Sequence, residues 1–446
     1  MHHHDSAARR DLIRSELWRV DASDPTAGAA IAKHHKMAAS PLRFLRGSAQ
    51  LYYADLASAV LQLPPALLSR VPPTTVMGDC HVSNFGLLTE EGSHGETVVF
   101  CPNDYDDACL GHAAWDLARY IISLVLAADY CRGGLAGRYR SDELDDPAGL
   151  TAATDTDARD AGRTFLDAYA DTCRDSVDDP ARRAGALTSV PKRHMLRKPF
   201  KKAQRRMAGG RDFANKSTLG KEVEVSGDRP RFRDRPERFA ALDPARARQV
   251  HQAFRPYVDD EVLDLVLRLG AGTGSVDLER FYLLVGPADF AGDADLPLCH
   301  VVEIKQQRVS APIHHFPDLR PENRLDPAHL TADCQRRMQR SPDLVLDEAI
   351  WEGKHWLVRS RHHARVGIDP EDIALGKRKP GKGLAQYAAV CGEALALAHV
   401  RGDRRSTRFE AAMAGVLADE ADALLDAAAG YAARVIADWR LLQGML

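Results

Sequence analysis

The sequence has little of what marks several classes of protein. Its 446 residues include eight cysteines, none in a Cys-x-x-Cys spacing, so reduced thiols are the default. No secretory signal and no long apolar run are visible, and a membrane protein is therefore not expected. The formal net charge of −3 gives no electrostatic reason to expect a membrane or nucleic-acid partner. We expect a protein of the reducing cytoplasm.

Asparagine is also scarce, and its placement is informative. Only four occur, and Asn84 follows Asp79 by five residues within the run 78–86, Gly-Asp-Cys-His-Val-Ser-Asn-Phe-Gly. An acidic cluster at 103–108 comes next and contains Asp104. In kinase-like enzymes an aspartate positions the attacking hydroxyl, while an asparagine five residues later and a further aspartate hold Mg²⁺. Asp79, Asn84 and Asp104 fit these roles in that order.

These motifs resemble the aminoglycoside phosphotransferase and choline kinase branch of the protein-kinase-like fold. The likeness rests on Gly-Asp-x-His-x-x-Asn at 78–84, Asp-x-Asp-Asp-Ala at 104–108 and Asp-Leu-Ala at 116–118, where a long apolar helix is predicted to begin. It implies a role for each of six residues. These are Asp79 and His81 in catalysis, Asn84, Asp104 and Asp106 at the metal, and Asp116 as a buried support of the catalytic loop. His81 fits either a structural or a chemical role.

More narrowly, four segments together resemble the bacterial domain-of-unknown-function family 2252. They are 40–47 (Ser-Pro-Leu-Arg-Phe-Leu-Arg-Gly), the run 78–86, the strand-like 301–305 and 396–403 (Ala-Leu-Ala-His-Val-Arg-Gly-Asp). This resemblance covers nearly the whole chain. Within the first segment, Arg46 is assigned a supporting role at the site.

The order of the parts is unusual for a kinase. An ordinary kinase places its glycine-rich loop and the lysine-bearing strand before the catalytic loop, but residues 1–75 offer neither. A glycine run occurs later, at 269–276, and the strand 300–305 that follows resembles the Val-Ala-Ile-Lys strand whose lysine contacts nucleotide phosphates. The residues assigned to the nucleotide are Gly270, Gly272, Gly274, Ser275 and Lys305, since glycines let backbone amides approach phosphate oxygens. We therefore predict a circularly permuted kinase-like fold.

Two features depart from the kinase pattern. Asp277 stands where the loop would have a third glycine, so it either sits away from the phosphates or repels them. Glu303 replaces a small residue and, because strand residues alternate between faces, points the same way as Lys305, with which it could pair. The usual lysine partner is a glutamate on a nearby helix. The best positional match within 328–339 is Asp333, one methylene shorter.

Each motif also has a simpler explanation. Asp79, Asn84 and Asp104 could form a polar loop with an Asx turn and a helix cap, which these residue types favour, although three aligned motifs favour the site. A glycine run by itself is typical of a connection, and only its place before the lysine strand indicates phosphate binding. Lys305 could be an edge residue that discourages aggregation, although its apolar neighbours favour a buried, paired lysine.

A basic run at 192–206 raises the question of nucleic acid. Clustered lysine and arginine neutralise phosphates, but Phe200 is the only aromatic residue in the run. A solvated helix face is favoured, so nucleic acid is not expected as a partner. The His-His pairs have no spaced partner set, and no metal beyond Mg²⁺ is expected.

The pattern of apolar residues predicts an α+β protein with two lobes. Residues 5–245 would form a helical catalytic region, 246–370 a nucleotide-binding region, and 371–446 alanine-rich helices that return to the first lobe. Predicted helices include one from Ser40 to about Leu61, 156–173, 261–268, 384–399 and 408–442. Predicted strands include 281–285, 300–305 and 356–359, with a linker or short β excursion near 228–237.

The favoured function is ATP- and Mg²⁺-dependent transfer of a phosphoryl group to an unidentified hydroxyl, which Asp79 would orient or deprotonate. The acidic cluster would suit a cationic acceptor such as an aminoglycoside, but metal binding already accounts for it. Two alternatives stay open. With ATP bound in the reverse sense, a kinase-like fold transfers the nucleotide, and Glu303 and Asp277 would fit an altered phosphate cradle. A degenerate kinase would only bind nucleotide and regulate a partner, which the joint presence of Asp79, Asn84 and Asp104 disfavours.

Overall fold

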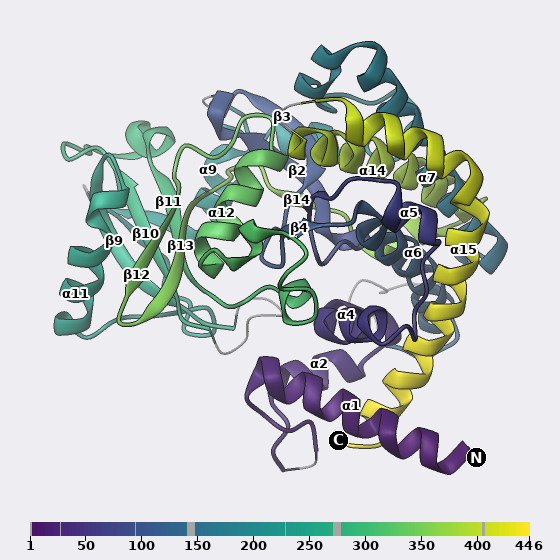
Figure 1. The fold of residues 1–446 in the computed structure, drawn as a ribbon. Helices are drawn as coiled ribbons and strands as arrows, with labels where there is room; N and C mark the ends of the chain where they lie inside the picture. The colour runs from purple at the N-terminus through teal and green to yellow at the C-terminus, as the bar shows by residue number, and fades with distance from the viewer. Residues whose placement is uncertain are drawn as a thin grey trace.

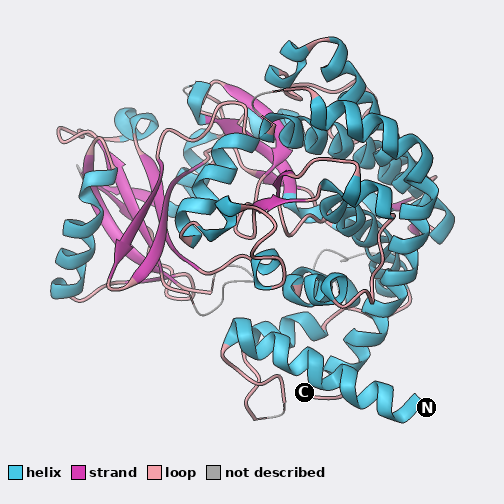
Figure 2. Ribbon diagram, in the orientation of Figure 1, coloured by secondary structure: helices cyan, strands magenta, loops and turns pink. Residues whose placement is uncertain are grey.

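Helices gather on one side of the molecule and antiparallel strands on the other (Figure 1, Figure 2). The computed structural model describes residues 2–26, 28–93, 95–140, 148–227, 229–270, 278–403 and 406–446. The predicted α+β class is confirmed over these ranges. None of the helices within them is both long and apolar enough to cross a membrane.

The helical side is built around α6 (Ala113–Leu135), most of whose residues are buried. Both α7 (Asp155–Asp178) and α15 (Arg408–Gln443) pack against it, and α14 (Pro380–Gly402) packs against α7. Five N-terminal helices complete this side: α1 (His2–Asp21), α2 (Ala32–Ala38), α3 (Pro41–Gly47), α4 (Ala49–Ala57) and α5 (Pro65–Ser69). Since α15 contacts four of them, the first and last parts of the chain share one hydrophobic core.

A buried ion-pair cluster also joins the two ends of the chain. The Arg9 guanidinium donates to Asp438 Oδ1 at 2.9 Å and to Asp55 Oδ2 at 2.6 Å, so α1 is tied to α15 and α4. The Tyr431 hydroxyl donates to Asp55 Oδ2 at 2.6 Å. Buried charges are retained when they are paired and hydrogen-bonded in this way.

Six antiparallel strands form the sheet on the other side, in the order β12-β13-β11-β10-β9-β8. They are β8 (Phe239–Ala240), β9 (Glu261–Arg268), β10 (Arg280–Gly286), β11 (His300–Gln307), β12 (Leu346–Trp351) and β13 (Lys354–Arg361). One face packs on α11 (Pro244–Phe254), where Phe254 and Phe281 share a core. The opposite face meets α12 (Pro327–Met338) through Leu357. The strands predicted at 281–285, 300–305 and 356–359 are confirmed.

The segment 261–268, predicted as a helix, is the strand β9 instead, so that prediction is wrong. Its apolar side chains reach two cores, Val262, Leu265 and Leu267 in one and Leu263 and Val266 in the other. A short run that is apolar on both faces has no period that separates a buried strand from a helix, and pairing with β10 decides the matter. The glycine run therefore follows one strand and precedes its antiparallel neighbour.

The helix predicted from Ser40 to Leu61 is two helices. Ser40 caps the first as expected, because its Oγ accepts a hydrogen bond from the Arg43 amide at 3.2 Å. The break falls at Ser48, whose backbone is not helical, and α4 then ends at Ala57. The remaining predicted helices are confirmed, and the β excursion is a hairpin of β6 (Val223–Ser226) and β7 (Arg229–Phe232).

Two small sheets lie between the helices and the large sheet (Figure 1). In one, β1 (Thr74–Val76) pairs with β4 (Cys109–Gly111). In the other, β2 (Phe85–Glu90) pairs with β3 (Thr97–Pro102) and with β14 (Val366–Gly367). The loops 77–84 and 103–108 are thereby held at the junction of the two sides.

Candidate active site

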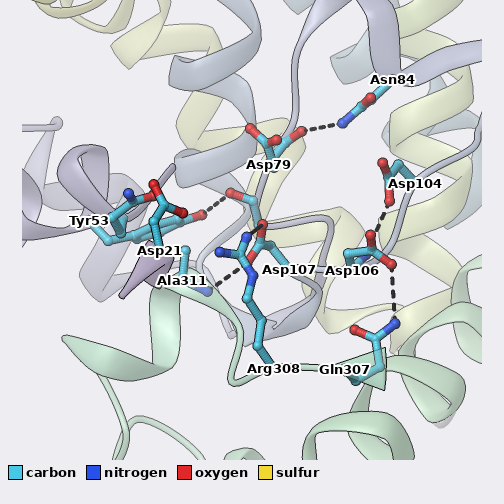
Figure 3. A network of polar contacts seen from close by, with 12 residues as sticks. Asp21, Tyr53, Asp79, Asn84, Asp104, Asp106, Asp107, Gln307, Arg308 and Ala311 are labelled. Carbon is cyan, nitrogen blue, oxygen red and sulfur yellow. Dashed lines mark hydrogen bonds and ion pairs between the residues drawn. The ribbon is translucent and has the colours of Figure 1, made fainter. Parts of the chain in front are cut away.

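A cleft of about 290 Å³ opens where these two loops face the large sheet. Its walls include predicted site residues from three distant parts of the chain. They are Arg46, Asp79, His81, Asn84, Asp104, Asp106 and Lys305. Figure 3 shows Asp79, Asn84 and Asp104 on the neighbouring loops, with Asp106 next to Gln307 of β11.

The Asp79 carboxylate is held by Arg119 of α6, which is fully buried. The Arg119 Nε donates to Asp79 Oδ1 at 2.8 Å, and its Nη2 donates both to the same oxygen and to the Leu45 carbonyl at 2.7 Å. The guanidinium lies 5.2 Å from the centre of the Tyr52 ring. Burial raises the pKa of the Asp79 carboxyl, and Arg119 opposes that shift. Both Arg119 hydrogen bonds go to Oδ1, and Asp79 is among the residues that line the cleft.

The backbone before Asp79 is held by Asp116, which is completely buried. Its carboxylate accepts hydrogen bonds from the Met77 amide at 2.6 Å and the Gly78 amide at 3.1 Å. His399 Nε2 lies 3.1 Å from the same carboxylate. Gly78 has a φ of +76°, and a Cβ there would lie 1.8 Å from the Asp107 carbonyl oxygen, so only glycine fits this turn.

His81 lies beside Asp79 as a neutral imidazole. Burial lowers its pKa well below the ordinary value, and its Nδ1 accepts a hydrogen bond from the Ser83 amide at 3.2 Å. The proton is therefore on Nε2, which is 3.6 Å from Asp79 Oδ2. This arrangement orients the histidine toward the carboxylate without making it a base.

A single hydrogen bond orients the Asn84 side chain. Its Nδ2 donates to the Asp79 carbonyl oxygen at 2.9 Å, so its own carbonyl oxygen is left as an acceptor (Figure 3). Asp104 Oδ1 accepts from the Asp106 amide at 3.3 Å. Amide and carboxylate oxygens suit Mg²⁺, which takes one or two protein ligands and completes its shell with phosphates and water. Among the described residues, no group of three or more His, Cys, Asp or Glu side chains is arranged to hold a metal ion.

Lys305 reaches the cleft from β11 and is almost completely buried. It pairs with Asp106, which also accepts a hydrogen bond from Gln307 Nε2 at 3.3 Å. Burial lowers the pKa of the Lys305 ammonium to about 7, and Asp104 opposes the shift. Asp106, predicted as a metal ligand, is thus in contact with the lysine.

Glu303 points into the same cleft as Lys305, as the alternation of strand residues predicts, but its partners are arginines. Arg280 Nη1 and Arg359 Nε each donate to it at 3.0 Å, and Arg361 lies at 3.4 Å. Burial alone would raise the pKa of Glu303, but the three guanidinium groups hold it well below its usual range. Glu303 therefore does not neutralise the lysine.

Asp333, Arg46 and the glycine run are the remaining predicted parts of the site. Asp333 lies on α12 but pairs with Arg337 at 2.5 Å, one helical turn away, so the predicted pair with Lys305 is not formed. Arg46 lines the cleft without a hydrogen bond or ion pair to any described residue, and its supporting role at the site stays a prediction. Gly270 is exposed with a φ of +60°, while Gly272, Gly274, Ser275 and Asp277 lie outside the described residues.

One family model matches the chain over residues 26–136 and 148–444, which is most of its length. The chain belongs to the DUF2252 family. The description of this family is "uncharacterized protein conserved in bacteria". No curated protein and no solved structure gives a significant match. The family resemblance predicted from the sequence is confirmed, and the likeness to kinases stays a prediction.

Sequence reasoning missed two groups at this DUF2252 site. Arg119 had a detectable signal, because a charged residue within the apolar stretch of α6 is buried only with a partner. The second group is the set of arginines Arg359, Arg361 and Arg365 on and after β13. Their place in the cleft follows from the register of β11 on β13, in which Glu303 lies opposite Arg359. That register cannot be predicted from local sequence.

Proposed function

We propose that this DUF2252 protein is an ATP- and Mg²⁺-dependent phosphotransferase with a two-lobed, circularly permuted kinase-like fold. The observation that carries the proposal is the convergence of Asp79, Asn84 and Asp104 with Lys305 in one cleft. The first three come from the helical side and the lysine from the large sheet. A base, two oxygen ligands for Mg²⁺ and a cation for phosphates are the parts that phosphoryl transfer requires.

The strand order supports the kinase-like reading of the large sheet. The strands β9, β10 and β11 are consecutive antiparallel neighbours, with the glycine run between the first two and Lys305 on the third. Protein kinases keep their glycine-rich loop ahead of a lysine on the third strand. The catalytic-loop motif precedes this sheet in the chain, and the helices of 371–446 pack on the helical side, which is the order expected of a permuted chain.

In the proposed mechanism the acceptor hydroxyl gives its proton to Asp79 Oδ2. Arg119 occupies Oδ1, which leaves Oδ2 as the oxygen that can accept it. The carbonyl oxygen of Asn84 and the carboxylate of Asp104 would hold Mg²⁺, which supplies charge neutralisation at the phosphates. Nucleotide phosphates would compete with Asp106 for the Lys305 ammonium, with which it pairs in this structure.

The test is incubation of the purified protein with Mg²⁺ and ATP labelled separately at the α and γ positions, with and without a cell extract. We expect transfer of the γ label and release of ADP. Asp79→Asn should retain nucleotide binding and lower turnover by roughly 10² to 10⁴, the range for a general base. Asp104→Ala should weaken Mg²⁺-dependent nucleotide binding. Asp419→Asn, at an exposed position of α15, is the matched control.

The other possible results of these experiments would each change a specific part of the proposal. Unchanged turnover in Asp79→Asn removes that residue from the role of base, and superimposable Mg²⁺ titrations remove Asp104 from the metal. Transfer of the α label with release of pyrophosphate assigns nucleotidyl transfer. Binding without transfer of either label assigns a regulatory module, and no nucleotide binding refutes the proposal.

A further inference from the structure

The walls of the cleft carry more positive than negative side chains. Seven cations and five carboxylates line it within the described residues. Five of the cations contact a carboxylate: Arg280, Arg359 and Arg361 contact Glu303, Lys305 contacts Asp106, and Arg308 contacts Asp107. Arg46 and Arg365 are different, because neither side chain makes a hydrogen bond or ion pair anywhere in the described part of the chain.

Both arginines line the cleft, and Arg46 is near the loop where chemistry is proposed. Arg46, at the end of α3, is close enough to Asp79 and Asp104 for both carboxylates to act on its charge. Arg365, just before β14, is acted on first by the like charges of Arg361 and Arg359 and then by the opposite charge of Asp104. A guanidinium group remains charged at any working pH and presents a fork of donors that matches phosphate and carboxylate oxygens.

The basic run that the proposed function leaves unused adjoins this side. Arg206 Nη1, two residues beyond α8 (Arg197–Gln204), donates to the Arg365 carbonyl at 3.4 Å. Lys202 on α8 and Arg46 both act on the charge of Asp369. The positive charge of α8 therefore continues into the cleft at Arg46 and Arg365. An excess of cations over carboxylates in the cleft favours ligands of negative charge.

We propose that Arg46 and Arg365 form an anion-binding subsite for the acceptor, which would carry a phosphate or carboxylate group near the hydroxyl that Asp79 addresses. This inference rests on the proposed phosphotransferase function and names its substrate class. The nucleotide phosphates are assigned to the sheet side with Lys305, whereas Arg46 comes from the helical side and lies near Asp79. A cationic acceptor such as an aminoglycoside would be repelled by both guanidinium groups.

The test is calorimetric titration of the full chain with inorganic phosphate, first alone and then with a saturating non-hydrolysable ATP analogue and Mg²⁺. The parent should bind phosphate in both states. Arg46→Gln and Arg365→Gln should each weaken phosphate binding about tenfold or more, as expected when a charge-assisted contact is lost. Their dissociation constants for the analogue should stay within about threefold of the parent value. Arg193→Gln, exposed in the basic run but outside the cleft lining, should bind phosphate like the parent.

Three results would overturn the subsite: no phosphate binding by the parent, equal binding by parent and both cleft variants, or an equal loss in Arg193→Gln. Displacement of phosphate by the analogue, or weaker analogue binding in both cleft variants, would assign the arginines to nucleotide phosphates and refute the acceptor assignment. Phosphate binding without any analogue binding would leave the anion site standing and refute the proposed function instead. Because neither arginine is hydrogen-bonded within the described chain, both variants should fold, which circular dichroism checks.

Discussion

Replacing Arg119 with methionine would remove the guanidinium that holds Asp79. Arg119 is completely buried and the Asp79 side chain is 19% exposed, so the pair is largely out of water. Removing one partner of a buried ion pair costs about 3 to 5 kcal/mol, because the other charge is left uncompensated. The partial exposure of Asp79 favours the lower end of that range. The Leu45 carbonyl would also lose the donor that Arg119 supplies at 2.7 Å.

The assay is urea denaturation of the parent, Arg119→Met, Asp79→Asn and the double variant. The double variant should be more stable than the sum of the single losses predicts, because it leaves no unpaired charge. For residues in direct contact the coupling free energy should be at least about 1.5 kcal/mol. Arg138→Met is the matched control, since Arg138 lies 3.4 Å from Asp129 but is half exposed, and it should cost less than about 1 kcal/mol.

Additive losses in the double variant would refute the reasoning, because they would show that Asp79 and Arg119 do not share a charge interaction in the folded protein. A loss in Arg119→Met no larger than in the Arg138 control would have the same meaning. Either result would also remove the reason given for assigning the acceptor proton to Asp79 Oδ2.

Three further predictions concern stability. Each oxygen of Asp116 accepts from one buried amide, so Asp116→Asn replaces one of these two acceptors with an NH2 donor and should lower the free energy of unfolding by about 1 to 3 kcal/mol, measured in urea. Gly78→Ala should lower the free energy of unfolding by roughly 1 to 3 kcal/mol more than Gly137→Ala does, because Gly137 has a similar φ of +70° but open space for a Cβ. Equal thermal midpoints of the two variants would contradict this. Burial raises the pKa of Asp343 from 3.8 to about 7, so the folded state binds an extra proton and the parent loses stability as pH rises through that window. The free energy of unfolding of Asp343→Asn, compared with that of the parent, should therefore be higher at pH 8 than at pH 5.

Much of the fold could be predicted from local pattern. The long helices α7, α14 and α15 were visible because their apolar residues recur with the period of one element over enough residues. The strand β11 was visible through its resemblance to the Val-Ala-Ile-Lys strand of kinases. The strand β9 was not, because both of its faces are apolar and nothing within eight residues distinguishes a buried strand from a helix. The break at Ser48 was missed for a related reason, since tertiary packing overrides helix propensity at single residues.

In the candidate site, too, some residues could be predicted from local sequence and others could not. Asp79 and Asn84 were recognisable because the proposed chemistry needs them five residues apart in one loop, where a single hydrogen bond links them. Asp333 was the wrong partner for Lys305, because sequence position could not show that Asp333 is engaged by Arg337 on its own helix. The lysine instead meets Asp106, which stands in a loop on the other side of the cleft.

The sequence by itself determined the family and the α+β class and indicated the residues of the two candidate loops, because each depends on residue types at short, regular spacings. Only the tertiary structure decided the charge partners: Arg119 for Asp79, three arginines for Glu303, and none in the described chain for Arg46 and Arg365. The physical reason is that an ion pair depends on distance and on exclusion of water, and both are set by strand register and helix packing across hundreds of residues.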